Sequence, residues 1–147
     1  MDDVTQAIIK QLLVALNVTL LGPKKHFYCY LPQKGGCPAR EFLDSRSDEA
    51  KAQYLKLFTY HREGHILRGD KWKELTDGIY EYKNNSDKSR LLYVPARSGL
   101  HVLLLGFGGK KENKVEPGHV GRAKEMRNEY EARAKIIENS FNKGKKS

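Results

Sequence analysis

A carboxylate and two cationic side chains lie close together in the chain at Glu81, Lys83 and Arg90. This combination suits chemistry on a phosphate ester, in particular cleavage of RNA by its own 2′-hydroxyl. That reaction requires a base for the hydroxyl proton and a donor for the leaving oxygen, and it requires cations where charge develops on the phosphate. Arg90 is suited to hold the phosphate, because its guanidinium stays charged and matches two phosphate oxygens. Glu81 could take the proton or could orient the lysines.

Other basic residues extend this group. A Lys-Lys pair follows the apolar segment Val102–Leu105, and His119 follows Pro117, where a side chain that titrates near neutral pH could carry a proton. No metal or other cofactor is required, because arginine and lysine can stabilise the charge. The predicted catalytic residues are Glu81, Lys83, Arg90, Lys111 and His119, and the predicted RNA-binding residues are Lys71, Lys73, Lys110 and Lys114.

Each of these residues also has a simpler interpretation. Glu81 and Lys83 could be ordinary solvated charges on a strand, Arg90 could pair with Glu81 across two strands, and His119 could be structural. The Gly108–Lys111 segment lacks the GxxxxGK[ST] pattern of a phosphate-binding loop. The combination therefore carries more weight than any single residue.

The composition supports an acidic partner. The chain has 147 residues and a formal net charge of +9, which suits one basic domain that attracts polyanions. No apolar run is long enough to cross a bilayer, and the start Met1-Asp2-Asp3 is acidic where a secretion signal is basic. We therefore expect a cytoplasmic protein without a membrane partner.

The chain contains two cysteines, Cys29 and Cys37. Together with His26 they would supply at most part of a zinc site. Two reduced, partly buried thiols are the stronger prediction for a cytoplasmic protein.

Hydrophobic periodicity, capping residues and chain breakers predict the elements that position these groups. Helices are predicted for Val4 to about Asn17, Ala39 to about Leu43, Ser47 to about Glu63, and Pro117 to Phe141. Strands are predicted for His26–Leu31, Gly78–Lys83, Arg90–Val94 and His101–Phe107, the last three as an antiparallel meander.

Alternation along Gly78–Lys83 predicts which side chains face the core. Tyr80 and Tyr82 share one face and fill the core, whereas Glu81 and Lys83 point outward from the opposite face. Arg90 would lie beside them across the hairpin. The sequence thus predicts a cationic cleft that contains a carboxylate.

From Gly36 to about Arg133 the chain resembles the HigB-like, phage-derived branch of the RelE/ParE superfamily of bacterial toxins. The matching segments are Cys37–Asp44, Lys73–Lys83, Arg90–Tyr93 and Leu103–Lys111, and Pro117 with Ala123 and Arg127 resembles the closing helix of the family. The resemblance implies an α+β fold, with N-terminal helices packed on a small antiparallel sheet and a C-terminal helix. It divides the chain into an N-terminal extension (1–35), a toxin core (36–141) and a basic tail (142–147).

The resemblance also implies a function. The family cleaves mRNA in the ribosomal A site and is neutralised by an antitoxin encoded beside the toxin, here expected to be a helix-turn-helix protein. Its site residues correspond to Glu81, Lys83, Arg90, Lys110 and Lys111. Three readings remain open: a ribosome-dependent RNase, a non-enzymatic ParE-like gyrase poison or inactive binding relative, and a phage structural protein that packages nucleic acid. The oligomeric state is not predicted.

Overall fold

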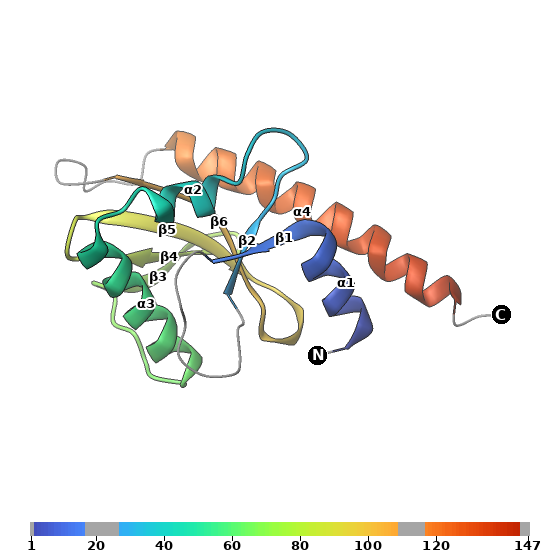
Figure 1. Cartoon of the computed structure of the whole chain (residues 1–147), viewed down its shortest axis with the longest axis horizontal. Coiled ribbons are helices and arrows are strands. Elements are labelled where there is room, and N and C mark those ends of the chain that lie inside the picture. The colour runs from blue at the N-terminus through green and yellow to red at the C-terminus, as the bar shows by residue number, and fades with distance from the viewer. Residues whose placement is uncertain (1, 17–26, 109–116, 145–147) are drawn as a thin grey trace.

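The computed structural model describes residues 2–16, 27–108 and 117–144, which form an α+β fold around one six-stranded sheet (Figure 1). The strands lie in the order β1-β2-β6-β5-β4-β3. The helices are α1 (Asp3–Leu12), α2 (Pro38–Asp44), α3 (Asp48–Arg62) and α4 (Pro117–Gly144). The strands are β1 (Leu13–Ala15), β2 (Phe27–Tyr30), β3 (Trp72–Thr76), β4 (Ile79–Lys83), β5 (Ser89–Pro95) and β6 (His101–Gly108).

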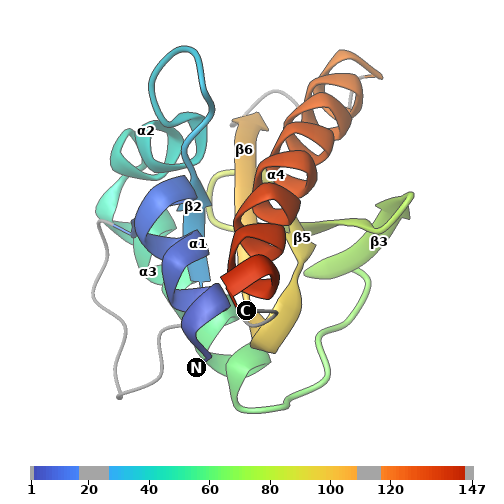
Figure 2. The ribbon, with the colours of Figure 1, turned by 90° about the vertical axis from the view of Figure 1, so that its right-hand side faces the viewer.

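The helices form a layer on each face of the sheet. In Figure 2, α1 and α4 lie side by side in front of the sheet; they bury Ile8 and Tyr130 together with Leu92 and Val102. On the other face, α2 and α3 pack against a second core that includes Cys29, Leu43, Phe58, Tyr82, Leu91, Tyr93 and Leu103. The predicted central strand covered on both faces is confirmed, because residues 102–105 are all buried.

Local capping fixes where the helices begin. The Asp2 carboxylate accepts a hydrogen bond from the backbone N–H of Thr5, and the Ser47 hydroxyl accepts one from the N–H of Ala50. Pro38 occupies the first position of α2, where its missing N–H costs nothing. The predicted starts of α2, α3 and α4 are confirmed.

The predicted end of the first helix is wrong. The helix stops at Leu12, and Leu13–Ala15 forms β1, which pairs antiparallel with β2. The strand buries Leu13 against Tyr30, its partner in the sheet. This pairing gives the backbone of residues 13–15 hydrogen-bond partners outside a helix, and the apolar period of four does not reveal it.

The predicted meander of β4, β5 and β6 is confirmed, but the prediction of an all-antiparallel sheet is wrong. β2 pairs parallel with β6, so the sheet is mixed. β3, which no prediction included, pairs antiparallel with β4. The two strands are joined at Asp77 and Gly78, which both have positive φ, as a two-residue hairpin turn requires. β1 and β2, both from residues 1–35, belong to the same sheet as the rest.

The last helix, α4, runs over 28 residues and contributes Ala123, Met126, Tyr130 and Ile137 to the core. None of the helices in the described ranges is long and apolar enough to cross a membrane.

Candidate functional site

Three cationic side chains surround one buried carboxylate on the sheet, and we call these four residues the Glu81 cluster. Glu81 is fully buried. Arg90 Nη1 lies 3.2 Å from each carboxylate oxygen. The Nζ atoms of Lys73 and Lys83 lie 3.8 and 3.9 Å from Oε1. The structure therefore brings together Glu81, Lys83, Arg90 and Lys73 from the predicted set.

Strand register produces this arrangement. Lys73 on β3 is paired with Glu81 on β4, and Lys83 on β4 is paired with Arg90 on β5. Residues paired across strands share a face of the sheet, and so do residues two apart on one strand. Three neighbouring strands thus direct all four side chains to the face that α1 and α4 cover.

The predicted outward position of Glu81 needs correction. Glu81 does lie on the face opposite Tyr82, but its side chain has no exposed surface. The side chains of Lys73, Lys83 and Arg90 surround it; those of Lys83 and Arg90 are 23% and 12% exposed. Burying a carboxylate among cations satisfies its charge, whereas an unpaired one would be costly. Glu81 is therefore an internal counter-ion of the cluster.

The cluster keeps an excess of positive charge. Three cations and one carboxylate give the group a net charge of two positive charges. The pKa of Lys83 is lowered, first by partial burial and further by the cations of Lys73 and Arg90, whereas Glu81 opposes the shift. Lys83 Nζ also donates a hydrogen bond of 2.9 Å to the carbonyl oxygen of Gly69. A bound anion would relieve the repulsion between these cations.

A surface pocket of about 230 Å³ opens beside Lys83 and Arg90. Its wall also carries Lys88, an exposed residue that the sequence prediction missed. The remaining lining residues are the acidic Asp70 and the uncharged Asn84, Asn85 and Ser89. Lys88 has a φ of +63° in the turn before β5. Only the fold shows that this turn borders the Glu81 cluster.

His119 lies in the first turn of α4, where its ring stacks on Phe107, with centroids 4.0 Å apart and planes 5° apart. Phe107 on β6 is paired with Arg90 on β5, so the two share a face. The fold therefore brings His119 to β6, the strand next to the one that carries Arg90, but His119 does not line the pocket beside Lys83 and Arg90. Phe107 was missed, because its role depends on a contact between a strand and a helix.

Among the other predicted RNA-binding residues, Lys71 belongs to the described part of the chain. The carbonyl oxygen of Lys71 accepts a hydrogen bond from the backbone N–H of Lys83, which places Lys71 at the same corner of the sheet. Lys110, Lys111 and Lys114 lie outside the described residues.

A second histidine, His61, lies away from the Glu81 cluster. It lies in the last turn of α3, half-buried, with Nδ1 2.6 Å from the hydroxyl of Tyr82. That hydroxyl lies 3.2 Å from Nδ1 of His101. Burial lowers the pKa of His61. This group lies on the face covered by α2 and α3, opposite the Glu81 cluster.

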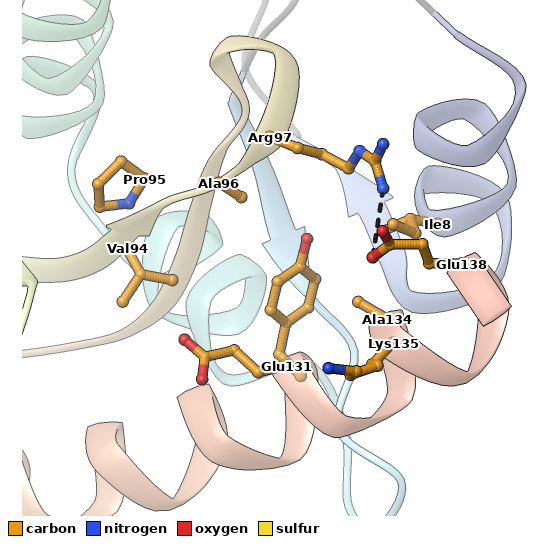
Figure 3. A pocket seen from close by; sticks show the side chains of 10 residues that line it. Ile8, Val94, Pro95, Ala96, Arg97, Glu131, Ala134, Lys135 and Glu138 are labelled. Carbon is orange, nitrogen blue, oxygen red and sulfur yellow. Dashed lines mark ion pairs between the residues drawn. The ribbon is translucent and has the colours of Figure 1, made fainter.

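A larger cavity, of about 440 Å³, lies between α1, α4 and the end of β5 (Figure 3). Ile8, Val94 and Ala134 supply apolar lining, and an ion pair of 3.7 Å between Arg97 and Glu138 crosses it. None of the predicted site residues lines it. A site chosen by cavity size alone would therefore miss the Glu81 cluster.

Among the described residues, no group of three or more His, Cys, Asp or Glu side chains is arranged to hold a metal ion. His26, the third member of the partial zinc site considered from the sequence, lies outside them.

No protein-family model matches this chain, and neither does any curated protein. The resemblance to the RelE/ParE superfamily therefore rests on the sequence segments Cys37–Asp44, Lys73–Lys83, Arg90–Tyr93 and Leu103–Lys111.

Proposed function

We propose that this protein is a metal-independent endoribonuclease of the RelE/HigB type, a toxin that cleaves mRNA on the ribosome and thereby inhibits translation. The observation that carries the proposal is the position of Arg90: a buried carboxylate fixes its guanidinium beside an open cationic pocket. Such pre-organised cations stabilise a phosphate as its charge increases in the transition state, without reorganising during the reaction.

Arg90, Lys83 and Lys88 are assigned to the phosphate. All three line the same pocket, and the net charge of +9 attracts a polyanion to it. Glu81 contacts Nη1 of Arg90 with both carboxylate oxygens, which anchors one end of the guanidinium. Arginine is better suited than lysine to this position, because its planar group meets two phosphate oxygens at once.

Proton transfer is assigned to His119, and Glu81 becomes a positioning residue. Glu81 is fully buried among its three cations, so a 2′-hydroxyl would have to displace them to reach it. The ring of His119 is held in one plane by Phe107. An imidazole can take a proton from a hydroxyl or supply one to a leaving oxygen.

The partners in this proposal are mRNA in the ribosomal A site and a cognate helix-turn-helix antitoxin. Both come from the resemblance, and the cationic surface supports the first.

The burial of Glu81 favours one alternative, a non-enzymatic relative that binds nucleic acid or acts as a gyrase poison. A carboxylate closed in by cations leaves the cluster able to bind a polyanion, with no base of its own exposed. The two candidates differ in turnover, because only the first consumes RNA.

The test compares the purified wild type with Arg90→Ala on ribosomes programmed with mRNA, in buffer freed of transition metals. Lys10→Ala is the matched control, because it removes an exposed cation from α1. The RNase proposal expects new mRNA 5′ ends with the wild type and Lys10→Ala but not with Arg90→Ala. Binding of mRNA by the wild type without any cleavage would reject it and support the binding protein.

A further inference from the structure

Cys29 and Cys37 are in direct contact. Cys29 lies in β2 and is fully buried, whereas Cys37 is the half-buried N-cap residue of α2. The side chain of Cys37 packs against the buried cluster that contains Cys29, and the two thiols interact with each other. The Cys37 thiol in turn donates to the carbonyl oxygen of Tyr30, at 3.3 Å. The two thiols are therefore neighbours in the folded protein.

The fold holds both ends of this contact. Cys29 is paired with Leu103 on the central strand β6. α2 packs on the same strand, where the ring of Phe42 lies against Gly106. A short loop joins β2 to α2, as Figure 1 shows in light blue. Because two elements packed on one strand carry the thiols, their proximity does not depend on the loop alone.

The two thiols differ in acidity and in access. The interaction with Cys29 lowers the pKa of Cys37; the backbone N–H of Arg40 and its guanidinium act in the same direction, whereas burial opposes them. The same interaction, together with burial, raises the pKa of Cys29. The thiolate is the reactive form of cysteine. Cys37 is thus suited to react first, and Cys29 lies behind it.

We propose that Cys37 is a peroxide-reactive site and that Cys29 resolves it, so that peroxide converts the pair into an intramolecular disulfide. The Cys37 thiolate attacks one oxygen of hydrogen peroxide; an S–O bond forms, the O–O bond breaks, and the released hydroxide takes a proton to become water. Cys29 then loses its proton and attacks Cys37 Sγ. The S–S bond forms as the S–O bond breaks, and a second water leaves.

The reaction is balanced in atoms and electrons. Two thiols lose two electrons and two protons, and one peroxide is reduced to two waters. An alkyl hydroperoxide would react in the same way and yield an alcohol and one water. The disulfide would tie the N-cap residue of α2 to β2, and a thiol reductant would reverse it. This inference is independent of the proposed RNase activity, because neither cysteine belongs to the Glu81 cluster or its pocket.

The test treats the folded protein with hydrogen peroxide, alkylates the remaining thiols, and measures the intact mass. The wild type should lose both alkylatable thiols, remain monomeric in mass, and recover both thiols with dithiothreitol. Thermal unfolding of the oxidised protein should shift upward by about 5 °C, because a short loop is closed.

Two variants separate the roles. Cys29→Ser keeps the reactive residue and should accumulate a sulfenic acid at Cys37 that dimedone traps. Cys37→Ser should keep Cys29 reduced at the same peroxide concentration. Two free thiols in the treated wild type, or equal oxidation of Cys29 in Cys37→Ser, would overturn the proposal, and so would a disulfide that forms only between molecules.

Discussion

Arg90 on β5 and Glu81 on β4 form the shortest of the three ion pairs to the buried carboxylate, with Arg90 Nη1 3.2 Å from both oxygens. This relationship makes Glu81 part of the support for Arg90 rather than a group presented to solvent. It therefore changes what each substitution in the cluster should do.

Glu81→Gln should lower stability and raise RNA affinity. It removes the counter-charge of three cations, and breaking a buried pair is costly, so we expect a loss of about 2–3 kcal/mol in urea unfolding. Without that carboxylate the cations should hold single-stranded RNA more tightly at low salt, as fluorescence anisotropy would show. Unchanged stability with weaker RNA binding would contradict the assigned role of Glu81.

His119→Asn should separate catalysis from binding. If His119 carries the proton, cleavage should fall by a factor of about 10²–10⁴, whereas the dissociation constant for RNA should stay the same. Phe107→Leu removes the ring that stacks on His119, so it should cause a smaller loss of cleavage in the same direction. Single-turnover rates on ribosome-bound mRNA measure both variants. Full activity of His119→Asn would exclude this residue from proton transfer.

His61 should make stability depend on pH. Burial lowers its pKa below 6.5, the ordinary value for histidine, so below that pH the unfolded chain binds the proton more readily than the folded one. The contribution of neutral His61 to the free energy of unfolding is fully present above about pH 6.5. It is lost as the pH falls from there through the lowered pKa of the folded state. Melting temperatures measured from pH 8 to pH 5 should fall in the wild type and fall less in His61→Gln. His65→Gln, at an exposed site near the end of α3, is the control and should follow the wild type.

Gly106→Ala should be destabilising because of one ring. A Cβ at this position would overlap the side chain of Phe42 on α2. We expect a cost of about 1–3 kcal/mol from overpacking. In the double variant with Phe42→Ala, the combined loss should be smaller than the sum of the two single losses. Additive losses in chemical denaturation would mean that the two positions are not coupled.

The sequence predicted the elements whose signals are local. Pro38 identified the start of α2 and the capping residue Ser47 that of α3, and the spacing of apolar and polar residues identified β4, β5 and β6. β3 was missed although the Asp77-Gly78 hairpin signal follows it. Leu13–Ala15 was assigned to a helix, because pairing with β2 depends on residues far away in the chain. The parallel pairing of β2 with β6 was missed for the same reason, because it too joins segments that lie far apart in the chain.

At the candidate site, too, local patterns predicted some features, and contacts between distant segments determined the others. Residue types and alternation predicted that Glu81, Lys83 and Arg90 share a face, and the register confirms it. The complete burial of Glu81 could not be predicted, since it depends on where three long cationic side chains lie. The stacking of His119 on Phe107 and the position of Lys88 in the pocket depend in the same way on contacts between distant elements.

The most direct measurement induces the wild type and Arg90→Ala in growing cells and maps the 5′ ends of cellular mRNA while growth is followed. Lys10→Ala serves as the control for losing one positive charge. The proposed function predicts growth arrest and new mRNA ends in register with the reading frame for the wild type and the control, and neither for Arg90→Ala. The same new ends in Arg90→Ala, or arrest by the wild type with intact mRNA, would contradict it.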